Sequence, residues 1–427
     1  MTDRAFAAFE RLFGPEFGHG KSFDLAPLRA ALNALGDPQD KLPFPIHVAG
    51  TNGKGSTIAF MRAIAEAADL RVHAFTKPHL HRLTERFTVA AKAVSEDALT
   101  LAAEQIAEIS RDLTQFDAQV AAAFLLFSEE AADITLIETG MGGRDDSTNA
   151  ITRPAATVIT PIALDHQDAL GATLSEITMH KAGILKPGVP AIVSRQRDEV
   201  REIIEARASR IGAQLQLQGV DWDAYAAHGR LAVQTEEETL DLPLPTLAGQ
   251  HQIDNAGLAV AALLFADAPI SNDAFAAGIA NARWPARLQP LTRGPLSAPI
   301  RAIGGEVWID AGHNAHAADA LAQALHGMDA KRPATTVAII GMRARKDANA
   351  FVSTLASAVD QLIAVPLSED HIAPDALAQL AGAKDIDAST VGSLAAAMQN
   401  AARLTAPRVL ICGSFLLAAE ALAAESA

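Results

Sequence analysis

The stretch from Phe44 to Met61, FPIHVAGTNGKGSTIAFM, constrains the fold of this chain more than any other. Its first residues are apolar and partly β-branched, which predicts a short buried strand. Gly50, Gly53 and Gly55 follow at once, and Ser56 opens an alanine-rich helical run. A glycine-rich turn between a strand and a helix presents backbone N–H groups at the positive end of the helix dipole. The sequence therefore predicts a strand–loop–helix unit that suits a polyphosphate.

Two side chains in this turn strengthen the prediction of a phosphate site. Lys54 supplies a positive charge, and a Ser/Thr hydroxyl is a suitable Mg²⁺ ligand. The strict Walker pattern places Lys directly before Ser or Thr, whereas here Gly55 separates Lys54 from Ser56. The loop is therefore a variant. An ordinary glycine turn is the alternative interpretation, and the presence of both a lysine and a hydroxyl favours phosphate binding.

Length and composition exclude several classes of protein. A chain of 427 residues predicts two domains, and 49% apolar residues predict a globular fold. The formal net charge of −15 argues against broad nucleic-acid binding. Cys412, the single cysteine, fits a reducing compartment, and the first residues show no apolar leader segment. The most apolar run, about 256–266, is too short to cross a bilayer. We expect a cytoplasmic protein without nucleic-acid or membrane partners.

Strand and helix patterns alternate along most of the chain. A strand is predicted to end on Glu138, another ends near His166, and the helix after it carries Lys181. This alternation predicts a doubly wound parallel α/β sheet. Several short strand-like segments suggest a small β region at about 190–245, and the Pro- and Arg-rich stretch 281–295 suggests an interdomain linker. The pattern then restarts, so we expect domains at 1–292 and 296–427, the second a smaller Rossmann-like α/β domain.

Four polar residues lie at predicted strand ends or helix starts of the first domain. These are Ser56, Glu138, His166 and Lys181, which can converge on the phosphate loop. Ser56 and Glu138 are oxygen donors of the kind that Mg²⁺ prefers, and His166 is a softer ligand. Three of the four have a plainer interpretation. His166 can be a hydrogen-bonded structural histidine, Glu138 a helix cap or salt-bridge partner, and Lys181 a surface lysine.

The second domain offers fewer signals. Asp310 and His313 follow a predicted strand, and an acidic residue at a strand end can hold a ribose hydroxyl. The alternative for Asp310 is a strand-end cap. Asn255 and Arg287 can also reach a nucleotide, but neither lies in a motif that says so.

Taken in chain order, these stretches resemble the folylpolyglutamate synthase/dihydrofolate synthase family, a branch of the Mur ligase superfamily. The motifs that carry the resemblance cover nearly the whole chain and are specific in combination. They are HVAGTNGKGST, PHL…TERF, IETGMGGRDDSTN, ALDHQDALG, HKAGILKPG, WPARL, DAGHN and CGSFLLAAE.

The resemblance implies an ATP-dependent ligase with a defined set of site residues. Those implied to contact ATP are Thr51, Asn52, Gly53, Lys54, Gly55, Ser56, Asn255, Arg287, Asp310 and His313, the last two across an interdomain cleft. Ser56 and Glu138 are implied to bind one Mg²⁺ and His166 a second. Lys181 matches the lysine that the family carbamylates with CO₂, which would also make it a metal ligand. The catalytic residues implied are Lys54, His166 and Lys181.

The resemblance also implies a pocket for a pterin substrate. The matching positions are Arg29, Arg82, Phe116, Asp117 and Asp146. The chain departs from the family near this pocket, with Lys77 where Ser is usual and Asp117 where Glu is usual. The substrate preference is therefore less firmly implied than the ATP chemistry.

The function implied is the addition of L-glutamate to dihydropteroate, to tetrahydrofolate or to both, through an acyl phosphate, by a monomeric enzyme. One alternative is another Mur-type ligase that joins an amino acid to a cell-wall precursor. Such ligases carry a nucleotide-sugar domain before the phosphate loop, and only about fifty residues precede it here. The other alternative is a phosphate-loop protein that does not ligate, which leaves DAGHN and the Lys181 segment unexplained.

Overall fold

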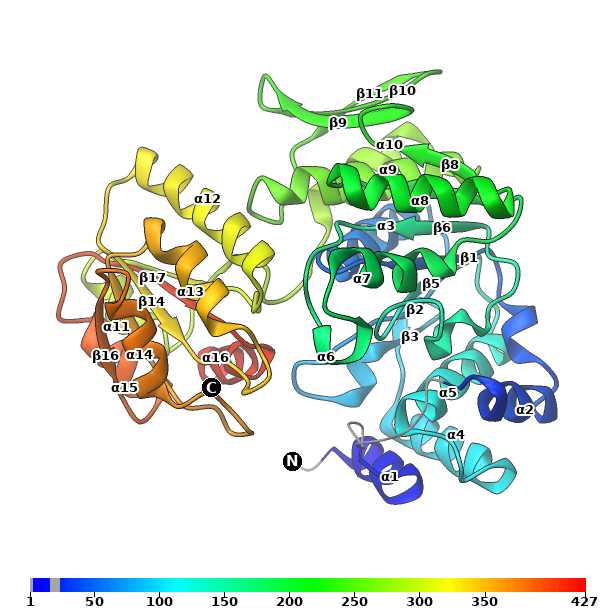
Figure 1. Cartoon of the computed structure of the whole chain (residues 1–427), viewed down its shortest axis with the longest axis horizontal. Helices are drawn as coiled ribbons and strands as arrows, with labels where there is room; N and C mark the ends of the chain where they lie inside the picture. Colours follow the sequence, from blue (N-terminus) through cyan, green and yellow to red (C-terminus); the bar gives the residue numbers. More distant parts are fainter. Residues whose placement is uncertain (1–2, 16–23) are drawn as a thin grey trace. The chain divides into compact units, whose positions relative to one another are not determined.

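The computed structural model describes residues 3–15 and 24–427, which form two compact units (Figure 1). Unit 1 comprises the described residues up to Thr246 together with Ile253–Arg283. Unit 2 comprises Leu247–Gln252 and Trp284–Ala427. No helix in these described parts of the chain has both the length and the apolarity needed to cross a membrane.

Unit 1 is built on an eight-stranded sheet in the order β4-β3-β2-β5-β1-β6-β7-β8. The strands β2, β5, β1, β6, β7 and β8 run parallel to one another. Strand β3 pairs antiparallel with β2, and β4 pairs antiparallel with β3. Strand β1 lies between β5 and β6, so its carboxyl end opens at the middle of the sheet. The bounds are β1 (Pro45–Ala49), β2 (Val72–Phe75), β3 (Phe87–Val89), β4 (Lys92–Ala93), β5 (Ile134–Glu138), β6 (Ala156–Ile159), β7 (Pro190–Val193) and β8 (Gln214–Leu217).

Helices cover both faces of this sheet, as the alternating pattern predicted. One hydrophobic core of this unit includes Phe9, Leu28 and Phe124, and a separate core includes Val200 and Ile204. The helices that contribute to these two cores are α1 (Arg4–Phe13), α2 (Ala26–Ala34), α4 (Glu96–Ile109), α5 (Gln115–Glu129), α7 (Leu174–Lys181) and α8 (Asp198–Ile211). Helix α3 (Lys54–Ala67) crosses from β1 to β2 and packs against α10 (Asn272–Asn281), while α6 (Gln167–Leu170) and α9 (His251–Phe265) complete the set.

A separate three-stranded antiparallel sheet follows β8. It consists of β9 (Trp222–Ala227), β10 (Arg230–Thr235) and β11 (Thr239–Pro243). The small β region is therefore shorter than the expected 190–245, because β7 and β8 belong to the large parallel sheet and α8 is the helix between them. The apolar strand Pro190–Val193 pairs with β6, and this pairing extends the α/β pattern by one more unit.

Unit 2 is a six-stranded sheet in the order β12-β13-β17-β14-β15-β16. Its strands are β12 (Gln289–Pro290), β13 (Glu306–Ile309), β14 (Thr336–Ile340), β15 (Gln361–Ala364), β16 (Asp387–Thr390) and β17 (Arg408–Cys412). Its helices are α11 (Ala298–Ala302), α12 (Ala315–Lys331), α13 (Ala348–Leu355), α14 (Pro374–Gly382), α15 (Leu394–Ala401) and α16 (Phe415–Ser426). The short 3-10 segments of the two units are Pro38–Lys41, Leu83–Arg86, Ser147–Ala150, Ala182–Ile184 and Ala356–Ala358.

The sequence suggested that the stretch 281–295 is an interdomain linker, but part of it belongs to the sheet of unit 2. Strand β12 pairs antiparallel with β13, and the side chains of Leu288 and Leu291 are buried. These residues therefore form an edge of the unit 2 sheet. The Pro and Arg residues suggested a linker, and the two-residue strand β12 is too short to show the alternating pattern that predicts a strand.

Candidate active site

The phosphate loop leaves the carboxyl end of β1 and is fastened to the segment that follows β6. Gly50 has φ 143°, and a Cβ at this position would collide with the side chain of Thr160, so the position requires glycine. The Thr51 backbone N–H donates to the carbonyl of Pro161 at 2.9 Å. The Thr51 hydroxyl lies 3.0 Å from both the carbonyl oxygen and the amide nitrogen of Ala163. These contacts hold the loop at the strand edge.

Helix α3 begins directly after the loop, at Lys54. Gly53 precedes it with φ 90°, and a Cβ on Gly53 would collide with Oδ1 of Asn255 from α9. Asn255 thus approaches the loop backbone closely. Ser56 is buried in the first turn of α3. A 14-residue helix that points its N-terminus at a glycine loop favours an anion at this place.

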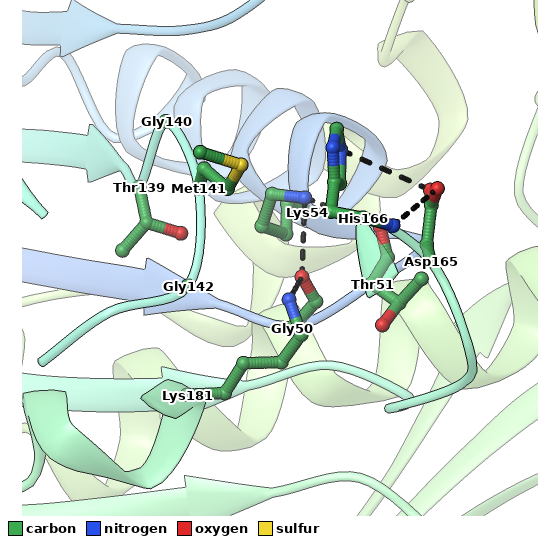
Figure 2. Close-up of a pocket in the computed structure, with 10 residues that line it drawn as sticks. All are labelled: Gly50, Thr51, Lys54, Thr139, Gly140, Met141, Gly142, Asp165, His166 and Lys181. Atoms are coloured by element: carbon green, nitrogen blue, oxygen red, sulfur yellow. Dashed lines mark hydrogen bonds and ion pairs between the residues drawn. The ribbon is translucent and has the colours of Figure 1, made fainter. Parts of the chain in front are cut away.

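Two lysines converge on one carbonyl of the loop (Figure 2). Nζ of Lys181 donates to the Gly50 carbonyl at 2.7 Å, and Nζ of Lys54 donates to the same oxygen at 3.2 Å. Lys54 also donates to the carbonyl of Thr51 at 3.2 Å. Burial at the end of α7, and then the nearby charge of Lys54, lower the pKa of Lys181 to about 7. Lys181 is therefore a buried amine and not a surface lysine.

Glu138 ends β5 beside these lysines. Its Oε1 lies 3.8 Å from Nζ of Lys54, and its Oε2 accepts from the backbone N–H of Lys77 at 3.1 Å. The carboxyl group is buried, with 4% of the side chain exposed. Glu138 thus brings a negative charge to the phosphate loop, and it also has the salt-bridge role that the sequence left open.

A small pocket lies between these elements, as Figure 2 shows. Its lining comes from the phosphate loop, the glycine-rich turn after β5, the segment after β6 and the end of α7. The lining residues are Gly50, Thr51, Lys54, Thr139, Gly140, Met141, Gly142, Asp165, His166 and Lys181. Residues from four separate parts of the sequence therefore meet at one edge of the sheet.

His166 lies at this pocket on an exposed turn. Its backbone has φ 52° at the start of α6, and its amide N–H donates to Oδ1 of Asp165 at 2.9 Å. Its Nε2 lies 4.0 Å from Oδ2 of the same aspartate. The imidazole therefore has an acidic neighbour that sequence reasoning did not single out.

The oxygen donors at this edge fit a divalent cation that is shared with a phosphate ligand. Mg²⁺ is usually bound by one or two carboxylates together with substrate phosphates, and Glu138 and the hydroxyl of Ser56 are donors of this kind next to the loop. Among the residues that the structure describes, no three His, Cys, Asp or Glu side chains form a metal-binding group of their own.

Three of the five predicted substrate residues lie together beside the pocket. Asp146 is buried and accepts from the amide of Met141 at 2.6 Å, and burial raises its pKa. Asp117 accepts from the hydroxyl of Ser147 at 2.6 Å and also closes the capping box of α5. The ring of Phe116 packs against Gly140 and lies 4.3 Å from Nζ of Lys77.

The two predicted arginines are placed differently. Arg82 is exposed, and its guanidinium contacts Glu96 at 3.4 Å. Arg29 is exposed on α2. Burial lowers the pKa of Lys186, and the positive charge of Arg29 lowers it further. No contact that we find joins Arg29 or Arg82 to the lining of the pocket within the described residues.

Unit 2 carries its own cluster of predicted residues. The Asp310 carboxylate accepts from the backbone N–H groups of Leu288 at 2.8 Å and Gly312 at 2.6 Å, which is the strand-end capping role left open by the sequence. The guanidinium of Arg287 lies 5.1 Å from the centre of the Phe415 ring, and the His313 ring lies 5.7 Å from it. Arg287 and His313 therefore flank one aromatic side chain at the start of α16.

Comparison with known proteins agrees with this arrangement. A model of the Mur ligase middle domain matches residues 48–263, and a model of the Mur ligase glutamate ligase domain matches residues 299–415. The dihydrofolate synthase/folylpolyglutamate synthase of Escherichia coli is 35% identical over 404 residues, which covers 93% of this chain and 90% of the relative. The chain belongs to the dihydrofolate synthase/folylpolyglutamate synthase family.

Other members of the family support the same conclusion. The dihydrofolate synthase/folylpolyglutamate synthase of Bacillus subtilis is 33% identical over 319 residues, covering 70% of this chain and 71% of that protein. A solved structure of E. coli FolC in complex with DHPP and ADP superimposes with a TM-score of 0.87 at 32% identity, covering 99% of this chain and 97% of that one. A bifunctional folylpolyglutamate synthase/dihydrofolate synthase with Mn, AMPPNP and L-glutamate bound gives 0.86 at 29% identity, covering 100% and 99%.

These findings confirm the predicted family, the α/β fold class and the assignment to the ATP-dependent ligases. The family motifs did not draw attention to several residues at the site. Met141 and Asp165 line the pocket, and Phe415 lies between Arg287 and His313. All three stand in motifs that carry the resemblance, Met141 in IETGMGGRDDSTN, Asp165 in ALDHQDALG and Phe415 in CGSFLLAAE, so the motifs were a usable signal.

Proposed function

We propose that this protein is an ATP-dependent ligase that adds L-glutamate to dihydropteroate, to tetrahydrofolate or to both. The observation that carries the proposal is the pair of lysines, Lys54 and Lys181, on the Gly50 carbonyl of a phosphate loop. The relatives named above bear the names of such ligases, and the loop offers the donors and charge that phosphoryl transfer needs.

The reaction has two steps in this proposal. A carboxylate of the acceptor attacks the γ-phosphorus of ATP, the bond to the β-phosphate oxygen breaks, and an acyl phosphate and ADP result. The amine of L-glutamate then attacks the acyl carbon, inorganic phosphate leaves, and the nitrogen loses a proton. Lys54 and the N-terminus of α3 bind and orient the phosphates, so that charge on the transferring group is stabilised.

The residues that hold ATP and the metal are assigned as follows. Ser56 and Glu138 would hold a Mg²⁺ ion, and His166 with Asp165 beside it would hold a second. Mg²⁺ supplies charge neutralisation for the phosphoryl group in this class of reaction. Asn255 meets the phosphate loop, and Arg287, Asp310 and His313 of unit 2 are proposed to contact the nucleotide. The Mn ion and AMPPNP named for a solved relative support this assignment.

Lys181 is proposed to carry a carbamate. The neutral amine attacks the carbon of CO₂, a C–N bond forms, and one proton is released. Only the neutral amine reacts, and a pKa of about 7 leaves a large neutral fraction at neutral pH. The product turns a cation into an anion beside Lys54, which would make Lys181 a metal ligand.

Labelled bicarbonate tests the carbamate. The wild type in [¹³C]bicarbonate should show one carbamate carbon resonance that Lys181→Ala lacks. Lys186→Ala is the control, because burial also lowers the pKa of Lys186, to about 8, at a site away from the pocket lining. A spectrum that is the same in wild type and Lys181→Ala would refute the assignment.

The acceptor is proposed to lie near Phe116, Asp117 and Asp146, with Arg29 and Arg82 as more distant contacts. ADP release measured with dihydropteroate and with tetrahydrofolate, each with and without L-glutamate, tests the function and the substrate choice together. Lys54→Ala should remove most of the activity, because Lys54 is the charge on the phosphate loop.

Lys92→Ala, at an exposed lysine on β4, is the matched control and should keep the activity. ADP release that needs neither acceptor, or that survives in Lys54→Ala, would overturn the proposal. Size-exclusion chromatography with light scattering tests the further proposal that the enzyme is a monomer, and cell fractionation tests its cytoplasmic location.

A further inference from the structure

A buried histidine in the central strand lies outside the pocket lining and has no part in the chemistry described so far. His47 is fully buried in β1, where its Cα pairs with Ile137 of β5 and Thr157 of β6. Burial lowers the pKa of His47 to about 3, so its ring is neutral. A neutral buried imidazole needs hydrogen-bond partners, and these partners point to its role.

The side-chain hydrogen bond of His47 leads to Asp146 through Thr148. Its Nε2 lies 2.8 Å from the hydroxyl of Thr148, and that hydroxyl lies 2.5 Å from Oδ1 of Asp146. A hydroxyl has one proton, which Thr148 donates to the carboxylate. Nε2 of His47 must therefore carry the hydrogen and donate to Thr148, while Nδ1 has no hydrogen-bond partner within the described residues. The tautomer is set by this chain of two bonds.

Asp146 in turn bonds the backbone of the glycine-rich turn 139–142, which lines the pocket and is called the wall below. One of its oxygens accepts from the Met141 amide at 2.6 Å, and the other accepts from the Thr148 amide at 3.1 Å. Gly140, Met141 and Gly142 line the pocket beside Lys54. The rigid central strand is thus connected to the glycine-rich wall through three side chains.

We propose that His47 is a positioning residue that fixes the wall 139–142 of the active site by orienting Thr148 and Asp146. A glycine-rich turn has little stiffness of its own, so its place depends on such contacts. The strand cannot shift, because β1 is paired on both sides. The kinetic part of the test rests on the proposed ligase function.

The chain contains a matched control. His73, on β2 of the same sheet, is also fully buried, and its ring stacks on Phe127 at 4.7 Å. Its Nε2 lies 3.0 Å from the carbonyl of Glu130, and its Nδ1 accepts from the amide of Ala90 at 3.1 Å, so its contacts lead to the end of α5 and to the turn after β3, not to the wall. Loss of either histidine removes a similar buried ring, but only loss of His47 releases Thr148.

The experiment compares His47→Leu, His47→Gln and His73→Leu. Gln keeps an N–H donor near the place of Nε2, whereas Leu fills the space without a donor. We expect His47→Leu to lower kcat/KM for the acceptor roughly tenfold or more, as misplaced active-site geometry does. His47→Gln should recover most of this loss. His73→Leu should lower the melting temperature about as much as His47→Leu and leave kcat/KM nearly unchanged.

A second measurement does not depend on the reaction. Hydrogen–deuterium exchange of peptides covering 139–146 should be faster in His47→Leu than in the wild type and unchanged in His73→Leu. If His47→Leu does not fold, Thr148→Val takes its place, with Thr135→Val as control, because the buried Thr135 hydroxyl has no hydrogen-bond partner in the part of the chain that the structure describes. Equal exchange in the wall, or equal kinetic loss in both histidine variants, would overturn the proposal. An inactive wild type would instead count against the ligase function, and the exchange result would still decide the role of His47.

Discussion

Replacement of Lys181 by Met should make the stability of the protein respond differently to pH. Burial and the charge of Lys54 lower the pKa of Lys181 from 10.5 to about 7. Between these two values the unfolded chain holds a proton on Lys181 that the folded chain does not. Stability therefore rises with pH across this window, since the unfolded state binds more protons. Below pH 7 both states are charged and the full penalty of burying the ammonium remains.

The size of the effect follows from the same two values. Each pH unit inside the window is worth about 1.36 kcal/mol, so the rise from pH 7 to 9.5 amounts to roughly 3 kcal/mol. Lys181→Met has a similar length and no charge, so it lacks this dependence. It also loses the hydrogen bond to the Gly50 carbonyl, which costs about 1 kcal/mol at every pH. The variant should therefore exceed the wild type in stability near pH 6.5 and lose this advantage by about pH 9.5.

Urea denaturation at several pH values, in metal-free buffer purged of CO₂, measures the difference. Lys92→Met is the control, because it makes the same substitution at an exposed lysine of the surface. A free-energy difference between Lys181→Met and wild type that stays constant from pH 6.5 to 9.5 would refute the reasoning. Added bicarbonate should restore stability to the wild type alone if Lys181 takes up CO₂.

Two further predictions concern backbone and core positions. Gly53→Ala should weaken binding of an ATP analogue, measured by calorimetry, because the new Cβ would collide with Asn255. Gly212→Ala is the control, because Gly212 also has a positive φ but open space around it, and this variant should only lower stability by about 1 kcal/mol. Arg408→Met should lower the free energy of unfolding by about 2 kcal/mol, because Arg408 is buried and its guanidinium bonds Glu306 at 2.7 Å; an unchanged urea midpoint would contradict this.

The parts of the site that could be read from the sequence are those formed by neighbouring residues. The strand, loop and helix around Gly53 are contiguous, so glycine spacing and apolar pattern were enough to predict them. Glu138 was predictable because parallel strands bring their carboxyl ends to one edge, which is a general property of the fold. The expectation that Lys181 lies at a strand end or a helix start was wrong, because Lys181 lies in the last turn of α7 and reaches the loop by its long side chain. Asp310 was predicted at a strand end, and the structure shows it there with its carboxylate bound to backbone N–H groups.

Contacts between distant segments could not be predicted in the same way. The bond between His47 and Thr148 joins residues 101 positions apart, and no periodicity indicates which threonine a buried histidine meets. Strand β16 escaped notice because Asp387–Thr390 is a mostly exposed edge strand without an apolar face. Likewise, the two-residue strand β12 is defined by its pairing with β13 and not by its own sequence.

The shared carbonyl of Gly50 explains why an altered Lys181 would suit this site better than an unaltered one. Two amino groups meet one oxygen, Glu138 lies 3.8 Å from Lys54, and the charge of Lys54 still lowers the pKa of Lys181 although Asp165 and Asp146 act in the opposite direction. A carbamate on Lys181 keeps an N–H that can still donate to Gly50, so the hydrogen bond survives while the charge changes from positive to negative. The repulsion of Lys54 would become an attraction, and an additional oxygen donor would face the phosphate loop. A carbamylated Lys181 no longer has an amine that takes up a proton between pH 7 and 10.5. The rise in stability with pH would therefore disappear when Lys181 is carbamylated, and the loss of this rise on addition of bicarbonate would measure the carbamylation.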